Sequence, residues 1–306
     1  GDIASCLQTE LHGVDITVFP YENIYLRLKS SVRSRDVFII QPTCSPVSDN
    51  ILKLLILIDA LRRDSAGRIT AVMPYFSYGR SDKKDQPRTP ITARLLADMI
   101  TTAGADRFFT LDLHAPQIAG FFSIPGDEMS AFPILSSYFL AKQLRNAVVV
   151  AADEGTSKRA RKFAEALDLP LAIVEKRRKD MQTEALTLIG EARGMDAVIF
   201  DDEVDTAGTV TNAAKLLREV GARDIYLCAS HAIFSAPATT RMAEAGFKEI
   251  VVTNTVPLPP EKNLPNLTVL SVAPFIAESL TRTRRKPRPA ATSSAIRAIR
   301  ASRPVS

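Results

Sequence analysis

The stretch DDEVDTAGTV, residues 201–210, joins acidic side chains to a turn of small residues. It follows an apolar run, MDAVIF, which has the composition of a buried strand. In an open parallel sheet, ligands bind at the carboxyl ends of the strands, so we expect Asp201, Asp202 and Asp205 near such an end. Carboxylates at this place suit sugar hydroxyls or a phosphate-bound Mg²⁺.

The residues that follow, Thr206, Ala207, Gly208 and Thr209, form a small turn before a predicted helix. The free N–H groups of a helix start, the helix dipole and the Thr hydroxyls all favour a phosphate. A sugar phosphate carries hydroxyls at one end and a dianion at the other, so it would satisfy both halves of the stretch. A helix capped by Thr or Asp after a polar strand end is the alternative, and the spacing alone leaves both open.

Two further junctions carry groups that suit phosphates. In AADEGTSKRARKF (151–163), Gly155, Thr156 and Lys158 lie between a predicted strand and a predicted helix, a reasonable cradle for a diphosphate. EKRR (175–178) ends another predicted strand with adjacent cations, which repel one another unless an anion is present. For this charge run a solvated surface turn is the alternative.

The elements that must position these residues alternate along the chain. Stretches with helical spacing separate short β-rich runs: DVFII, ITAVMPYF, RFFTLDLH, NAVVVAAD, PLAIVE, DAVIFDD, DIYLCASH, EIVVTNT and LTVLSV. Several of these runs are apolar throughout, as expected for strands that are covered on both faces. The alternation predicts an α/β fold of parallel sheets flanked by helices.

The chain contains an internal repeat. Residues 89–115 align without gaps on residues 206–232, and seven of the 27 positions are identical, His114 and His231 among them. We infer two tandem α/β domains of one ancestry, with a boundary near residue 145. A shared position in the fold could therefore explain His114 without a ligand.

The two copies differ in the turn. Pro90 and Ile91 in the first copy stand where the second copy has Ala207 and Gly208. A bulky Pro-Ile pair cannot provide the same close-approach turn. We therefore expect the small acidic loop to serve the second domain only.

The composition excludes some classes of protein. No apolar run reaches the roughly 18–20 residues that a membrane span needs. The net charge of +5 comes from residues 281–306, which hold eight of the 39 basic residues and no acid, so we expect no nucleic-acid partner. A nucleic-acid or membrane-surface arm is the alternative for this tail. Cys6, Cys44 and Cys228 are far apart and odd in number, which is typical of buried thiols in a reducing, cytoplasmic compartment.

The stretch 201–209 resembles the phosphoribosyl-binding loop of type I phosphoribosyltransferases and of ribose-phosphate pyrophosphokinases (PRPP synthetases). Longer segments of the sequence distinguish between these two families. SYGRSDKKDQPRTPITARLLADMITTAGADRFFTLDLHAPQIAGFF (77–122), DVFIIQPTCSPVSDNILKLLILIDALRR and FAEALDLPLAIVEKRR are similar to PRPP synthetases. The resemblance runs in order over about residues 1–280, whereas salvage phosphoribosyltransferases have one such domain, not two.

The resemblance implies two tandem type I phosphoribosyltransferase-like domains, each a largely parallel sheet flanked by helices. Residues 1–145 would form the nucleotide side, and residues 146–280 would carry the ribose 5-phosphate site and a catalytic loop. Residues 281–306 would be a basic tail, which we predict to be disordered.

The resemblance also assigns roles to single residues. Lys176 and Arg178 would be catalytic, on a mobile loop that closes over the transferring diphosphate. Ribose 5-phosphate would bind to Asp201, Asp202, Asp205, Thr206, Ala207, Gly208 and Thr209. ATP would bind to Phe19, Tyr21, Arg80, Ser81 and His114. The diphosphate loop would be Asp153, Gly155 and Thr156, and Mg²⁺ would be held by His114 and Asp153.

The chain departs from the family pattern at several of these positions. Ala152 and Thr156 replace the Pro and the second Gly of the diphosphate loop, and Ser81 replaces the usual Gln. Tyr21 and Asn23 replace the polar residues of the nucleotide loop. These changes put the nucleotide preference in doubt.

The function implied by the resemblance is transfer of the β,γ-diphosphate of MgATP to the anomeric hydroxyl of ribose 5-phosphate, giving PRPP and AMP. The enzyme would be cytoplasmic and would form dimers assembled into a hexamer. A non-catalytic regulatory homologue that binds synthetase partners is one alternative, which the altered loops favour. A salvage phosphoribosyltransferase that consumes PRPP is the other.

Overall fold

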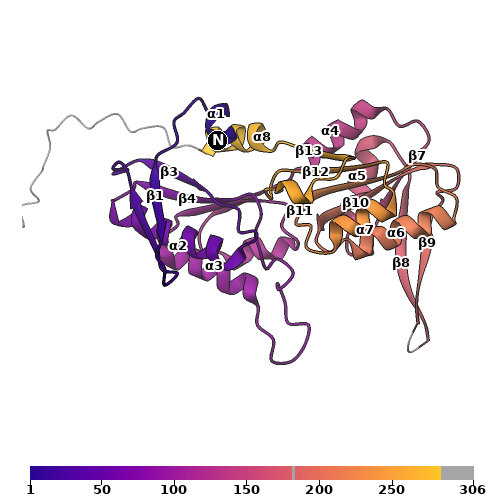
Figure 1. The fold of residues 1–306 in the computed structure, drawn as a ribbon, viewed down its shortest axis with the longest axis horizontal. Helices are drawn as coiled ribbons and strands as arrows, with labels where there is room; N and C mark the ends of the chain where they lie inside the picture. The colour runs from indigo at the N-terminus through magenta and orange to yellow at the C-terminus, as the bar shows by residue number, and fades with distance from the viewer. Residues whose placement is uncertain (181–182, 284–306) are drawn as a thin grey trace, which may run out of the picture.

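Two sheets of parallel strands follow one another along the chain (Figure 1). The structure is a computed structural model that describes residues 1–180 and 183–283, and the side chains of residues 176–185 lie outside the described part. The α/β class predicted from the alternation of elements is confirmed. Within the described residues no helix is both long and apolar enough to span a membrane.

The smaller sheet has four parallel strands in the order β3-β4-β5-β6. Its strands are β3 (Asp36–Ile40), β4 (Arg68–Met73), β5 (Arg107–Leu111) and β6 (Gly126–Met129). The helices of this region are α1 (Asp2–Cys6), α2 (Val47–Arg63), α3 (Thr92–Ala103) and the 3₁₀ helix η1 (Pro116–Phe121). A separate antiparallel hairpin consists of β1 (Val14–Val18) and β2 (Ile24–Leu28).

The larger sheet has the order β13-β12-β11-β10-β7-β8-β9 and is parallel except for its last pair. Its strands are β7 (Ala147–Ala151), β8 (Leu171–Asp180), β9 (Thr183–Ile189), β10 (Asp196–Val204), β11 (Ile225–Ala232), β12 (Glu249–Thr253) and β13 (Leu267–Leu270). Helices α4 (Phe132–Lys142) and α5 (Ser157–Leu167) lie on one face, and α6 (Gly208–Glu219) and α7 (Ala238–Ala245) on the other (Figure 1). The remaining helices are η2 (Pro260–Lys262) and α8 (Ala273–Thr283).

Helices α4 and α8 each pack against a sheet that lies on the other side of the predicted domain boundary. Leu135 and Phe139 of α4 pack with Phe163 in the core of the larger sheet, although α4 precedes the predicted boundary near residue 145. Conversely, the C-terminal helix α8 packs its buried residues against Val72 and other residues of the smaller sheet. The exact division into domains therefore stays a prediction.

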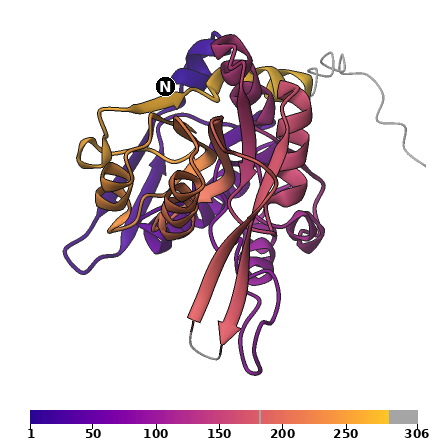
Figure 2. The same ribbon diagram turned by 90° about the vertical axis from the view of Figure 1, so that its right-hand side faces the viewer.

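The segment around Lys176 and Arg178 differs from the prediction. We expected a loop after PLAIVE, but β8 continues to Asp180 and pairs with β9, with Lys176 opposite Leu186 and Arg178 opposite Glu184. Figure 2 shows this two-stranded ribbon projecting from the rest of the sheet. A ribbon beyond the sheet does not require an apolar face, so the charge run did not reveal the strand.

The cysteine prediction was wrong at one position. Cys44 and Cys228 are buried free thiols, whereas Cys6 is exposed at the end of α1.

Candidate active site

Three consecutive acids, Asp201, Asp202 and Glu203, lie near the carboxyl end of β10. Their exposed fractions are 8%, 5% and 8%. β10 lies between β7 and β11 and runs on to Val204, past the strand end that we predicted at Asp202. Burial of a carboxylate is unfavourable unless partners replace its hydration, so the partners of these acids define the site.

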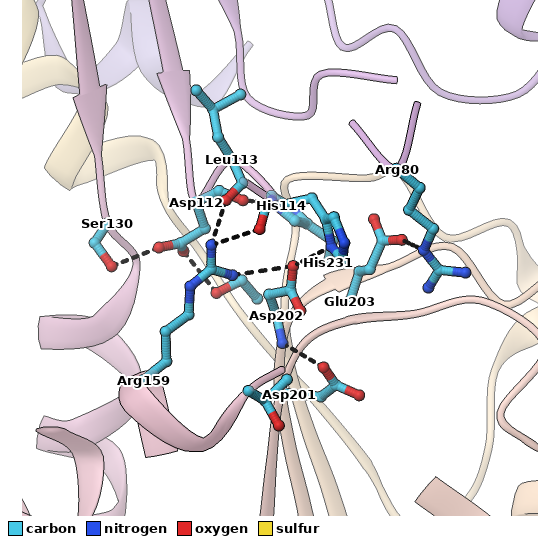
Figure 3. A network of polar contacts seen from close by, with 12 residues as sticks. Arg80, Asp112, Leu113, His114, Ser130, Arg159, Asp201, Asp202, Glu203 and His231 are labelled. Carbon is cyan, nitrogen blue, oxygen red and sulfur yellow. Dashed lines mark hydrogen bonds and ion pairs between the residues drawn. The ribbon is translucent and has the colours of Figure 1, made fainter. Parts of the chain in front are cut away.

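Asp202 has partners from two other segments (Figure 3). Its Oδ2 atom lies 2.9 Å from Nδ1 of His114 and 3.0 Å from Nη1 of Arg159. Arg159 also donates hydrogen bonds to the carbonyl oxygens of Leu113 and His114. One arginine of α5 therefore joins the loop after β5 to the strand β10.

The pKa values of the two adjacent aspartates move in opposite directions. Burial, followed by the charge of Asp202, raises the pKa of Asp201 well above its ordinary value. Burial also opposes ionisation of Asp202, but the hydrogen bond from His114 and the charge of Arg159 hold its pKa far below the ordinary value. The hydrogen bond to Asp202 in turn raises the pKa of His114 against the effect of burial. The ionised form of Asp202 and the protonated form of His114 therefore favour each other, whereas burial favours the neutral form of Asp201.

The turn after β10 leaves the start of α6 without a side-chain cap. Ala207 takes the N-cap position in the left-handed conformation, with φ 61°. The guanidinium of Arg241, from α7, donates to the carbonyl oxygen of Thr206 at 3.1 Å. Within the described residues no acceptor is recorded for the N–H groups of Gly208 and Thr209. The backbone donors of the helix start are thus available to an anion, as predicted for this type of turn.

The loop before α5 is held by its own side chains. Oδ1 of Asp153 accepts from the backbone N–H of Thr156 at 2.9 Å and lies 3.2 Å from the Thr156 hydroxyl. Thr156 is buried. The charge of Asp153 also contributes to the raised pKa of Asp201, so the two acids lie near each other. This places the predicted diphosphate loop beside the predicted sugar site.

Asp112 joins the two sheets. Its carboxylate accepts from the hydroxyls of Ser130 at 2.5 Å and of Ser230 at 2.6 Å. Nε2 of His231 lies 3.1 Å from the carbonyl oxygen of Asp112, and Nδ1 of His231 lies 2.9 Å from the hydroxyl of Thr255. His231 is 2% exposed. His231 therefore holds the junction between the two sheets together, whereas His114 faces the acids of β10.

Arg80 reaches the site from the segment after β4. Its Nε atom forms an ion pair with Glu203, and its Nη1 atom lies 3.8 Å from Asp205. Burial opposes the charge of Arg80, but Glu203 and Asp205 raise its pKa. These three residues line a hollow of about 190 Å³, together with Tyr75 and Gly79. The structure thus brings a predicted ATP residue, Arg80, to a predicted ribose residue, Asp205.

The other predicted ATP residues are arranged differently. Phe19 and Tyr21 stack on each other with ring centroids 5.3 Å apart, at the tip of the β1–β2 hairpin. In the part of the chain that the structure describes, no contact joins them to Arg80 or His114. Ser81 accepts the backbone N–H of Thr92 with its hydroxyl oxygen at 3.2 Å, so it holds the start of α3. Only Arg80 and His114 of the five lie together with the acids.

Lys176 and Arg178 are placed by their backbone alone. Both lie in β8, and their side chains lie outside the described residues. β8 is the neighbour of β7, whose carboxyl end leads into the Asp153 loop. Their catalytic role stays a prediction.

The sequence analysis missed three residues that the structure brings into the site. They are Arg159, Glu203 and Tyr75, whose hydroxyl lies 3.5 Å from Oε2 of Glu203. Burial, followed by the charge of Glu203, raises the pKa of the Tyr75 phenol above its ordinary range. The signal for Glu203 was its place among the acids of DDEVD, in a strand too buried for a solvated side chain. Arg159 gave no signal beyond its place in the first turn of a helix.

The donor set suits a divalent cation that arrives with a phosphate ligand. Among the residues that the structure describes, no three His, Cys, Asp or Glu side chains are grouped to hold a metal by themselves. Mg²⁺ commonly needs only one or two carboxylates when substrate phosphates supply other ligands. Asp153 fits this requirement through its second oxygen. His114 fits it less well, because its raised pKa favours the imidazolium, which binds phosphate oxygens instead of a metal.

Known proteins with similar sequences cover nearly the whole chain. A protein of Caldanaerobacter subterraneus called ribose-phosphate pyrophosphokinase is 48% identical over 283 residues, which are 92% of this chain and 90% of the relative. The protein of the same name from Bacillus caldolyticus is 47% identical over 282 residues, again 92% of this chain and 90% of the relative. The chain belongs to the ribose-phosphate pyrophosphokinase family.

Two family models and a crystal structure agree with membership of the ribose-phosphate pyrophosphokinase family. Residues 1–104 match the N-terminal domain of ribose phosphate pyrophosphokinase, and residues 179–288 match a phosphoribosyl synthetase-associated domain. The crystal structure of phosphoribosylpyrophosphate synthetase from Mycobacterium smegmatis superposes with a TM-score of 0.88 at 40% identity. It covers 92% of this chain and 93% of that chain. The resemblance inferred from the motifs is confirmed.

Proposed function

We propose that the protein is a ribose-phosphate diphosphokinase, which transfers the β,γ-diphosphate of MgATP to the anomeric hydroxyl of ribose 5-phosphate. The products are PRPP and AMP. One observation carries the proposal: the buried acids of β10 lead directly into an α6 start that has no side-chain cap. This juxtaposition suits the two ends of a sugar phosphate, and the relatives' name indicates the same substrate.

In this proposal the 5′-phosphate accepts hydrogen bonds from the N–H groups at the start of α6. Arg241, which contacts the carbonyl oxygen of Thr206, adds positive charge beside the same turn. The ribose hydroxyls bind to Asp201, Asp202 and Asp205. Asp202 keeps His114 in place through the contact between its Oδ2 atom and Nδ1 of the imidazole.

The nucleotide lies on the side of Arg80 and His114. His114 contacts phosphate oxygens through Nε2, since Nδ1 faces Asp202. Mg²⁺ is part of the MgATP substrate, where it neutralises phosphate charge, and Asp153 is the residue that fits it. Exposed apolar side chains of the β1–β2 hairpin, including Ile16, Val18 and Tyr21, support the proposal that a neighbouring subunit completes the ATP site. The resemblance to the PRPP synthetase family also leads us to propose that the enzyme is cytoplasmic and forms dimers assembled into a hexamer.

The chemical step is an in-line substitution at the β-phosphorus. The anomeric oxygen forms a bond to this phosphorus as the bond to the α,β-bridging oxygen breaks, and AMP leaves with that oxygen. The anomeric proton passes to solvent or to the leaving phosphate. Lys176 and Arg178 would neutralise the charge that is spread over the non-bridging oxygens.

A non-catalytic regulatory homologue is a second candidate, and one observation favours it. Thr156 occupies Oδ1 of Asp153 with both its N–H and its hydroxyl, and Ser81 is engaged with Thr92. Both residues stand at positions where the chain departs from the family pattern. Such a protein would bind ribose 5-phosphate but would form no AMP.

An AMP-release assay with ATP, Mg²⁺ and ribose 5-phosphate decides between these candidates. We expect the wild type to form AMP only when ribose 5-phosphate is present, and Lys176→Ala to lose about a hundredfold or more in rate. Lys248→Ala, a change at an exposed lysine near the end of α7, is the matched control and should retain full activity. No AMP from the wild type would reject the proposed reaction, and equal rates for Lys176→Ala and the wild type would reject the role of the lysine.

A further inference from the structure

Glu203 is a buried acid without a task in the reaction as proposed. It is 8% exposed and lies in β10, the strand that supplies the sugar-binding acids. Both of its carboxylate oxygens face the segment after β4: Oε1 pairs with Nε of Arg80, and Oε2 lies 3.5 Å from the hydroxyl of Tyr75. A buried carboxylate that points at side chains of another segment holds those side chains in place.

Arg80 is held along one edge of its guanidinium. Glu203 takes the Nε edge, while Nη1 is 3.8 Å from Asp205, too far for a good hydrogen bond. The Arg80 side chain is 55% exposed. Figure 3 shows its terminal nitrogens pointing away from His114 and Asp202. The edge formed by the two terminal nitrogens remains, and it can bind two phosphate oxygens at once.

Arg80 and Asp205 line the same hollow of about 190 Å³. Gly79 lines it too, and a Cβ at this position would lie 3.2 Å from Cβ of His114. The hollow is therefore bordered by a cation that faces outward and by an acid assigned to the sugar. One wall of the hollow is assigned to ATP and the other to ribose 5-phosphate.

We propose that Glu203 is a positioning residue for Arg80, which it orients so that the terminal nitrogens meet the polyphosphate of ATP. The inference rests on the proposed function, in which Arg80 contacts ATP. A free arginine side chain loses much rotamer freedom when it is fixed by a ligand, and anchoring it in advance removes that loss. The expected benefit is about tenfold in ATP affinity.

The charge of Glu203 acts in the opposite direction. A carboxylate beside the site repels a polyphosphate, so a residue that served only as a buried charge would weaken ATP binding. Removal of the side chain would then tighten the complex. The sign of the change in affinity therefore separates positioning from repulsion.

The test is a double-mutant cycle with Glu203→Met, Arg80→Ala and the double variant. Met has nearly the volume of Glu but accepts no strong hydrogen bond. We expect Glu203→Met to raise the Kd and KM for ATP about tenfold, with kcat at saturating ATP within about threefold of the wild type. In the Arg80→Ala background, the same change should have no further effect, because Glu203 acts through Arg80. Glu203→Gln, whose amide oxygen still accepts from Nε, should remain within about twofold of the wild type.

Glu278→Ala removes an Arg–Glu pair of the same kind at the surface of α8 and is the control. Thermal melting shows whether each variant is folded, and Glu203→Gln keeps the test open if Glu203→Met does not fold, because Gln must then match the wild type. A lower Kd for ATP in either Glu203 variant, an unchanged Kd in Glu203→Met, or additive effects in the cycle would overturn the inference. Absence of AMP formation by the wild type would instead reject the proposed function.

Discussion

Helices α3 and α6 begin within one residue of equivalent positions of the internal repeat, but their N-termini are satisfied differently. The N–H of Thr92 at the start of α3 donates to the hydroxyl oxygen of Ser81, and the next N–H donates to the carbonyl oxygen of the same serine. The start of α6 has no side-chain cap, and Arg241 lies beside it. One copy uses its helix start to hold its own loop, and the start of the other is the proposed site of the phosphate.

The two histidines of the repeat show the same division. His231 is buried and bonded to the protein at both ring nitrogens. The side chain of His114 is 39% exposed, and one of its nitrogens faces Asp202. A shared position in the fold therefore does not imply a shared role: contacts across the junction decide which copy meets the ligand.

Exchange of one residue between the two helix starts should have the largest effect. Gly208→Ile installs the residue that the first copy has at this position, and its Cβ would lie 3.4 Å from Nη1 of Arg241 and 4.0 Å from the Thr206 hydroxyl. The side chain would block the close approach of a phosphate, so we expect kcat/KM for ribose 5-phosphate to fall about a thousandfold. The reciprocal change, Ile91→Gly, should leave kcat/KM within about threefold. Equal losses in the two variants would contradict the comparison.

The histidines should separate activity from stability. We expect His114→Ala to lower kcat/KM about a hundredfold, because a phosphate contact is lost, and to change Tm little. His231→Ala removes two buried hydrogen bonds, so its Tm should fall by about 5 °C while the folded enzyme keeps most of its activity. Steady-state kinetics and calorimetric melting measure both effects. A loss of activity in His231→Ala together with a loss of stability in His114→Ala would mean that the wrong histidine has been assigned to the ligand.

Substitution of Asp201 and substitution of Asp202 should have different effects on activity at pH 8. Asp202→Asn removes the charge that holds His114 and Arg159, and we expect kcat/KM to fall about thirtyfold. Asp201→Asn resembles the protonated acid, so activity should stay within about threefold. The folded state raises the pKa of Asp201, so this acid destabilises the protein as the pH rises above its ordinary value of 3.8. Asp201→Asn should therefore raise Tm at pH 8 and have little effect near pH 4.

The smallest expected effect is the pH dependence of the pair between His114 and Asp202. The raised pKa of His114 gives stability that is complete below its ordinary value of 6.5 and is lost as the pH rises through the raised value. The depressed pKa of Asp202 gives stability that is present above 3.8 and is lost at lower pH. The wild type should therefore exceed His114→Ala in Tm by about 2 °C near pH 5.5, and the difference should shrink toward pH 9. A difference that grows with pH would exclude the pair as its cause.

Much of this arrangement could be predicted because its signals are local in sequence. The apolar runs marked the buried strands, and the alternation with helices fixed the α/β class. The stretch Thr206–Thr209 forms the start of a helix where its residues indicated, with Ala207 as the N-cap and Gly208 as the first residue of α6. The left-handed conformation of Ala207 in this turn had no signal in the sequence.

The partners of the acids could not be predicted, because they come from distant parts of the chain. Arg80 and Tyr75 meet Glu203 across the junction of the two sheets, and Tyr75 is 128 residues away in sequence. Arg159 looked like one more cation of an amphipathic helix until its contacts with Asp202 were known. The β8–β9 ribbon was missed for the related reason that its strands need no apolar face.

Binding of ribose 5-phosphate in the absence of ATP tests the central claim most directly, that acids and turn hold two ends of one ligand. Isothermal titration should show that ribose 5-phosphate binds to the wild type, and that ribose and inorganic phosphate each bind at least about a hundredfold more weakly. Gly208→Ile should lose ribose 5-phosphate binding while Ile91→Gly keeps it. Undiminished binding of ribose 5-phosphate to Gly208→Ile would contradict the account.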